Sequence, residues 1–148
     1  MNSDVPSDGA LLLDTCAVIW VANGDALALA ALEAIDRAGQ LGAIFVSPIS
    51  AWEIGLLSQP KIPRRSALQF LPDPKSWFAR FMAVPGITAA PLSAAIAIDA
   101  SHLPGILHGD PADRLLLATA RDLDVPIVTR DQRMIAYASA GHTRAIAC

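Results

Sequence analysis

The sequence predicts an α/β fold with a central parallel sheet of four to five strands. Short apolar runs rich in Leu, Ile and Val recur along the chain and end in polar residues. Each run is followed by a longer stretch in which apolar residues recur at helical spacing. This alternation is typical of βα units, whose strands pair in parallel. At 148 residues, of which 53% are hydrophobic, the chain is long enough for one domain with one core.

Five segments have the composition of strands. Residues 11–14 (LLLD), 44–47 (IFVS) and 126–129 (PIVT) are compact apolar runs, typical of strands that are buried on both faces. Residues 87–90 are a weaker candidate, and residues 143–147 are a candidate edge strand. The polar residues that close the buried runs are expected at the carboxyl ends of the strands.

Six segments show helical spacing, and two of them begin with a clear capping signal. In Ser47-Pro48 and Asp110-Pro111, a residue that caps helices well directly precedes a proline suited to the first helical position. The predicted helices cover residues 26–38, 48–58, 75–84, 93–102, 111–123 and 132–139.

The chain is expected to form a single domain over residues 10–148, after a flexible leader at residues 1–9. The leader is acidic and turn-forming, unlike a secretory signal. The longest uncharged run, residues 81–98, is interrupted by prolines and a glycine, so no membrane helix is expected. Cys16 and Cys148 are too few for a disulfide framework and lack the spacing of a zinc site. We therefore expect a cytoplasmic protein with reduced thiols.

The net charge of −3 gives no overall attraction to nucleic acid, so RNA binding requires a local basic patch. One candidate lies between residues 61 and 80, where the basic residues outnumber a single acid, Asp73. A solvated helical face explains the same charges equally well. The basic residues are Lys61, Arg64, Arg65, Lys75 and Arg80.

Acidic residues lie at three of the predicted junctions that lead into helices. Asp14 ends the first strand, Asp131 lies two residues past the last buried strand, and Asp110 and Asp113 open the helix at 111–123. Because the carboxyl ends of parallel strands meet at one edge of the sheet, these side chains can converge in space. Each also has a local explanation. Asp14 and Asp131 are good N-caps, and Asp110 with Asp113 resembles a capping box.

Glu53 is one of only two glutamates and lies in a segment that is otherwise uncharged and largely apolar. A partly buried carboxylate needs a partner. A charged partner such as Arg114 or Arg130 is one solution, and a metal ion shared with the other acids is the alternative. Four carboxylates at one sheet edge repel one another unless a cation or shared protons compensate. Mg²⁺ or Mn²⁺ suits such a site, because both prefer oxygen ligands and can activate water against a phosphate.

Four segments carry a family resemblance. They are LLLDTCAVIW at 11–20, SPISAWEIGLL at 47–57, LPGILHGDPADRLLLATA at 103–120 and IVTRDQRM at 127–134. In this order and spacing they resemble the PIN-domain ribonucleases, and among them the VapC toxins of bacterial and archaeal toxin–antitoxin pairs. The resemblance covers almost the whole chain. It implies that Asp14 and Asp113 are metal ligands and that Glu53 and Asp131 complete a set of four acids.

The resemblance also implies two supporting residues. Asp110 corresponds to the helix cap of the DPADR variant, and Thr129 is the small hydroxyl residue two positions before the last acid, suited to ordering that acid or a water. The chain departs from the family pattern at Cys16, where His or Ser is common, and in its longer leader. Neither departure removes an acid. We expect Cys16 to serve packing, although it lies close enough to Asp14 in the sequence to face the site.

By the same resemblance we expect a three-layer α/β/α PIN-like fold, dependence on Mg²⁺ or Mn²⁺ and endonucleolytic cleavage of RNA. A homodimer and inhibition by a cognate VapB-type antitoxin are implied as well. The alternative is a catalytically silent PIN-like module that binds RNA or an antitoxin, which the full set of four acids disfavours. A haloacid-dehalogenase-like phosphatase is disfavoured because it needs a second Asp where Cys16 stands.

Overall fold

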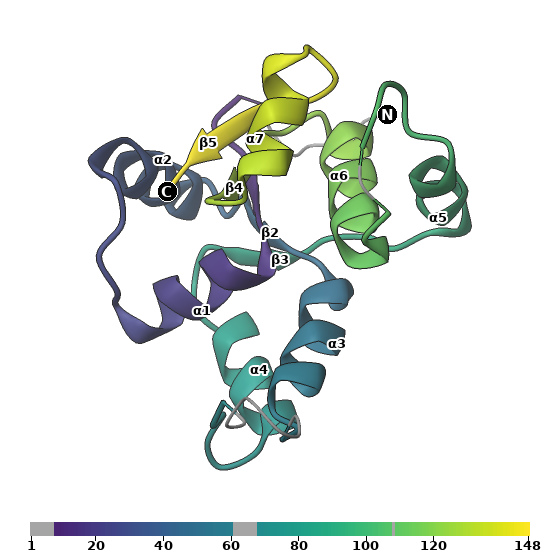
Figure 1. Ribbon diagram of the computed structural model, residues 1–148. Helices are drawn as coiled ribbons and strands as arrows, with labels where there is room; N and C mark the ends of the chain where they lie inside the picture. The colour runs from purple at the N-terminus through teal and green to yellow at the C-terminus, as the bar shows by residue number, and fades with distance from the viewer. Residues whose placement is uncertain (1–7, 61–67, 108) are drawn as a thin grey trace.

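A five-stranded parallel sheet lies at the centre of the computed structural model, which describes residues 8–60, 68–107 and 109–148 (Figure 1). The strands are ordered β3-β2-β1-β4-β5, so β1 pairs with both β2 and β4. All five predicted strands are confirmed, each slightly shorter than predicted. They are β1 (Leu11–Leu13), β2 (Ile44–Val46), β3 (Ile87–Ala89), β4 (Ile127–Thr129) and β5 (Ala145–Ala147).

Helices connect the strands. All six predicted helices form, with boundaries shifted by less than one turn. The capping signals at Ser47-Pro48 and Asp110-Pro111 are confirmed, because both polar side chains accept hydrogen bonds from the first turn of their helices. In the described residues the helices are α1 (Thr15–Asn23), α2 (Leu29–Gln40), α3 (Pro48–Leu57), α4 (Pro74–Met82), α5 (Ala94–Ser101), α6 (Pro111–Leu123) and α7 (Gln132–Ser139).

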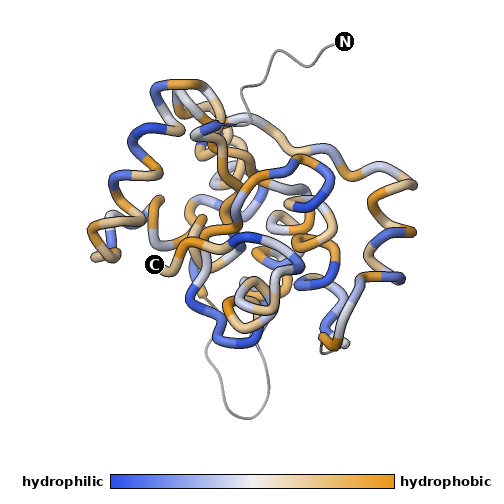
Figure 2. Tube along the Cα trace, turned by 90° about the horizontal axis from the view of Figure 1, so that it is seen from above, coloured by the Kyte–Doolittle hydropathy of each residue, from blue (hydrophilic) through white to orange (hydrophobic). Residues whose placement is uncertain are grey.

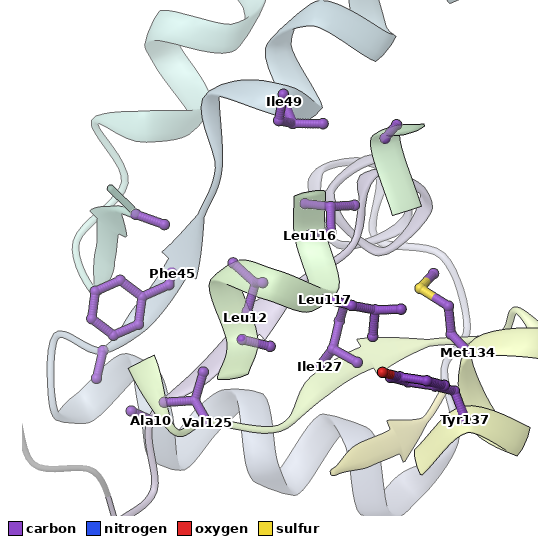
Figure 3. Packing of buried hydrophobic residues seen from close by; sticks show 14 residues of the cluster. Ala10, Leu12, Phe45, Ile49, Leu116, Leu117, Val125, Ile127, Met134 and Tyr137 are labelled. Carbon is purple, nitrogen blue, oxygen red and sulfur yellow. The ribbon is translucent and has the colours of Figure 1, made fainter. Parts of the chain in front are cut away.

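The side chains of the central strands alternate between two hydrophobic layers. Leu11 and Leu13 face a layer formed with α1, α2 and α4, whereas Leu12 faces a layer formed with α6 and α7. Figure 3 shows the second layer, in which Leu12 and Ile127 of the sheet lie beside Leu117 of α6. Along the trace, the outer helices mix hydrophilic and hydrophobic residues, as expected for helices with one side on the core (Figure 2). The predicted three-layer α/β/α fold is confirmed.

One helix was not predicted. The structure forms α1 over Thr15–Asn23, a segment whose β-branched residues have low helix propensity. Tertiary packing outweighs this propensity, because Val18 is fully buried against the sheet. Asp14 caps the helix by accepting a hydrogen bond from the N–H of Ala17 at 2.7 Å. Gly24 ends it in the left-handed region, at a φ of 71°.

Two sequence-based predictions fall largely outside the described residues. They are the flexible leader at residues 1–9 and the basic patch, whose members Lys61, Arg64 and Arg65 lie in the range that the structure leaves out. Both stay predictions. Within the described ranges, none of the helices has the length and apolar character needed to cross a membrane.

We expect Leu12→Ala to lower the free energy of unfolding by about 3 kcal/mol, because truncation of a buried leucine removes apolar contacts and leaves a cavity. Leu12 is 0% exposed on the central strand. The matched control is Leu29→Ala at the start of α2, where the side chain is 70% exposed. Its effect should stay below about 0.5 kcal/mol. Urea unfolding followed by circular dichroism measures both, and equal losses would contradict the central position of β1.

Candidate active site

The four predicted acids line one cleft of about 280 Å³ at the carboxyl ends of β1 and β4. Asp14 directly follows β1, and Asp131 lies two residues after β4. Glu53 comes from α3 and Asp113 from α6. We refer to this space as the carboxylate cleft. The structure thus brings together side chains that are far apart in the sequence. The other residues that line it are Thr15, Cys16, Trp20, Leu116, Arg130 and Met134.

Asp14 is the most buried of the four acids, at 5% exposure. Burial raises its pKa to about 6, from an ordinary value of 3.8. Hydrogen bonds from the Thr129 hydroxyl and the Ala17 N–H lower this pKa, and the negative charges of Glu53 and Asp131 raise it. The predicted N-cap role of Asp14 is therefore confirmed, but the cap does not compensate for burial beside other carboxylates.

Glu53 lies about one and a half turns into α3, which begins at the Ser47 cap. Burial raises its pKa. Its carboxylate accepts a hydrogen bond from the hydroxyl of Thr15. The Ser50 hydroxyl lies 3.1 Å from the same Thr15 oxygen. Because Thr15 gives its only hydroxyl proton to Glu53, Ser50 is the donor to Thr15 in this chain of hydroxyl groups.

Thr15 and Ser50 were missed by sequence reasoning. Arg130, one of the charged partners considered for Glu53, instead packs against Trp20. Two sequence signals point to the hydroxyl pair. Thr15 directly follows the first acid, and Ser50 precedes Glu53 by three residues, a spacing that places both on one face of a helix.

Asp110 and Asp113 have different positions, as predicted. Asp110 caps α6, and its carboxylate accepts a hydrogen bond from the N–H of Asp113 at 3.1 Å. Asp113 is half-buried and lines the carboxylate cleft. Burial raises the pKa of Asp113 to about 7, and the negative charges of Asp110 and Asp131 raise it further. A large part of the Asp113 population is therefore protonated at neutral pH in the metal-free chain.

Asp131 is both a cap and a member of the cleft. It accepts hydrogen bonds from the N–H groups of Arg133 at 2.8 Å and Met134 at 3.2 Å, at the start of α7. Its carboxylate also pairs with the Arg133 guanidinium at 3.5 Å. Burial alone would raise the pKa of Asp131, but the hydrogen bonds and the Arg133 charge together outweigh it and lower the pKa. Asp131 therefore stays ionised.

Thr129 connects two of the acids from the end of β4. Its fully buried hydroxyl oxygen accepts a hydrogen bond from the N–H of Asp131 at 3.0 Å. The same hydroxyl donates to the Asp14 carboxylate. The expectation that Thr129 helps to order the last acid agrees with this geometry, and its contact with Asp14 adds a second role.

Cys16 also lines the cleft. Burial, followed by the negative charge of Asp14, raises the pKa of its thiol to about 11. The group therefore stays a neutral thiol at pH 7 and lacks the thiolate character of a nucleophilic cysteine.

The donor set of the cleft fits a hard divalent cation, because every acidic ligand offers carboxylate oxygens. Burial and, after it, the negative charges of neighbouring acids raise the pKa values of Asp14 and Asp113, so a cation in the cleft would stabilise their ionised forms. Within the described residues, no three His, Cys, Asp or Glu side chains are already grouped closely enough to hold a metal. Side-chain adjustment would therefore accompany binding of an ion.

Comparisons with known proteins agree with the fold and with the sequence motifs. The chain is 35% identical over 130 residues to Ribonuclease VapC22 of Mycobacterium tuberculosis, covering 84% of this chain and 88% of that protein. A chain in the crystal structure of VapBC2 from Rickettsia felis, bound to a DNA fragment from the promoter, superposes with a TM-score of 0.59 at 16% identity. That match covers 93% of this chain and 98% of the other.

A chain in the structure of FitAB bound to an IR36 DNA fragment gives a TM-score of 0.48 at 19% identity, covering 93% and 94% of the two chains. The Rickettsia felis likeness supports the fold. The family itself follows from the sequence, because the model of the PIN domain matches residues 11–140, which hold all four acids of the carboxylate cleft. The chain therefore belongs to the PIN-domain family.

Proposed function

We propose that this chain is the toxin of a toxin–antitoxin pair and acts as a Mg²⁺- or Mn²⁺-dependent endoribonuclease. The observation that carries the proposal is the carboxylate cleft, in which four acids from separate elements meet and the pKa values of Asp14 and Asp113 are raised to about 6 and about 7. A site of this kind gains stability from a cation. The 35% identical relative is named a ribonuclease.

Each acid has a distinct proposed task. Asp14 and Asp113 hold the metal. Burial raises the pKa of both acids, so a nearby cation would stabilise their ionised forms. When bound, the ion would supply a polarised phosphate and an activated water. Glu53 has a raised pKa and is suited to accept a proton from the attacking water. Asp131 keeps its negative charge, and Thr129 holds Asp14 in place.

We also propose a cognate VapB-type antitoxin as inhibitor, a homodimer as the assembly and the cytoplasm as the location, where RNA is available. The Rickettsia felis structure with the same fold is a VapBC2 complex. Exposed apolar side chains are available for such contacts, among them Trp52 at 54% and Ile98 at 62% exposure.

We expect Asp14→Asn and Asp113→Asn each to slow RNA cleavage by on the order of a hundredfold or more, because loss of a metal ligand removes several kcal/mol of transition-state stabilisation. Asn caps helices as well as Asp, so the Asp14 variant should still fold. The matched control is Asp36→Asn on the exposed side of α2, which should cleave normally. Cleavage of a structured RNA in Mn²⁺ measures the three variants. Activity that survives both cleft substitutions, or that survives a chelator, would contradict the site.

The metal-free protein should lose stability as the pH rises from about 4 to about 7. Folding raises the pKa of Asp14 and Asp113 from 3.8 to about 6 and about 7, so the folded chain holds these protons more tightly than the unfolded chain. The resulting stability is present at low pH and is lost as these groups ionise. Asp113→Asn should flatten the curve of melting temperature against pH in this window.

The same measurement with Mn²⁺ tests the cation. At pH 7 the metal should raise the melting temperature of the wild-type protein, because it binds the folded state only. The increase should be smaller in Asp113→Asn and unchanged in Asp36→Asn. A melting temperature that does not respond to millimolar Mn²⁺ would count against metal binding by the cleft.

A further inference from the structure

Arg130 is the single basic residue among the described residues that line the carboxylate cleft. It stands between the end of β4 and Asp131, at the rim where the acids meet. An RNA strand that enters this cleft brings phosphate charges toward four carboxylates. A divalent ion compensates for part of this repulsion only. A cation fixed at the rim therefore has a direct effect on how strongly RNA binds.

The guanidinium of Arg130 is held by contacts from two other parts of the chain. Its central carbon lies 3.8 Å from the centroid of the Trp20 ring on α1. Its Nη2 donates to the Ala26 carbonyl at 2.8 Å. Stacking on an aromatic ring together with directed hydrogen bonds fixes the plane of a guanidinium. The group is thus ordered before any ligand binds.

None of these contacts neutralises the charge of Arg130. In the described part of the chain, Arg130 forms no ion pair with a carboxylate, whereas its neighbour Arg133 pairs with Asp131 at 3.5 Å. A guanidinium has more N–H donors than the contact to Ala26 uses, and Arg130 is exposed to solvent. A held, charged and accessible guanidinium is suited to a phosphate, whose oxygens match its fork of N–H donors.

We propose that Arg130 binds a backbone phosphate of the RNA adjacent to the one that is cleaved, and that Trp20 is the positioning residue that holds the guanidinium plane. The proposal rests on the proposed ribonuclease function. A purely structural role, in which Arg130 ties the Ala26 segment to β4, explains the Ala26 contact but gives no reason for an unpaired charge at the rim of the cleft.

The test measures cleavage of a mixed-sequence single-stranded RNA in Mn²⁺ over a range of salt concentrations. Arg130→Gln should raise KM roughly tenfold, the value of one charge-assisted hydrogen bond, and leave kcat nearly unchanged. The slope of log(kcat/KM) against log[salt] should become shallower by about 0.7, because one phosphate contact with a single strand is lost. Arg130→Lys keeps the charge and should retain the salt slope.

Arg37→Gln is the matched control. Arg37 lies in the last turn of α2, which leads into the amino end of β2 and therefore lies at the opposite edge of the sheet. This variant loses the same charge and should keep the wild-type KM and salt slope. Trp20→Leu should raise KM while keeping the salt slope, and Trp20→Phe should restore KM toward the wild-type value. Melting temperatures of all variants report on folding.

The inference is overturned if Arg130→Gln has the KM and salt slope of the wild type, or if its loss of activity lies in kcat alone. If the wild-type protein does not cleave RNA, the proposed function fails. Binding of the same labelled RNA, measured by fluorescence anisotropy, then decides the role of Arg130 separately. Weaker binding and a shallower salt slope in Arg130→Gln support it, and equal binding, or no binding by the wild type, refutes it.

Discussion

The pairing of β1 with β4 at the centre of the sheet is the constraint on which the carboxylate cleft depends. The register places Leu13 opposite Val128, and the N–H of Asp14 donates to the Val128 carbonyl at 3.1 Å. This brings Asp14 beside Thr129, whose hydroxyl contacts Asp14 and Asp131. A slip of one residue would turn the strand over and carry Asp14 out of the cleft. Leu11, Leu12 and Leu13 prevent it, because they fill both hydrophobic layers.

Two acids of the carboxylate cleft, Asp14 and Asp131, also cap helices, as Asp110 does outside the cleft. The partial positive charge of a helix N-terminus favours a carboxylate. For Asp131 the cap and an arginine outweigh burial, so the pKa falls. For Asp14 the cap does not outweigh burial. Asp113, which is no cap, has the highest pKa of the three aspartates in the cleft. Burial, together with the charges of neighbouring acids, therefore disfavours the ionised forms of Asp14 and Asp113, and a cation beside them would stabilise these forms.

The sequence located the strands, most helices and the four acids that meet at one sheet edge, and it missed one helix and one hydrogen-bond partner that depend on distant contacts. Apolar runs and capping residues located the strands and separated Asp110 from Asp113. The helix over Thr15–Asn23 was missed because its local propensity is poor and its stability comes from packing. The partner of Glu53 was expected to be an arginine or a metal. Its hydrogen-bond donor is the Thr15 hydroxyl, 38 residues away, a contact that follows only from the packing of α1 on α3, and the metal stays a prediction.

The two arginines on either side of Asp131 have different partners, and the proposed phosphate-binding role of Arg130 depends on this difference. Asp131 is the N-cap of α7, Arg130 precedes it and Arg133 lies within the helix. The two arginine side chains therefore start from different backbone conformations and contact different partners. Arg133 pairs with Asp131 and keeps it ionised. Arg130 also lines the cleft, but it is held by Trp20 and Ala26 and forms no ion pair with an acid of the described residues. If both arginines paired with carboxylates, the rim would offer no fixed positive charge to a phosphate. Stacking on Trp20 therefore keeps the Arg130 guanidinium from pairing with a carboxylate of the cleft. The proposed binding of a phosphate requires a guanidinium whose charge is not already paired in this way.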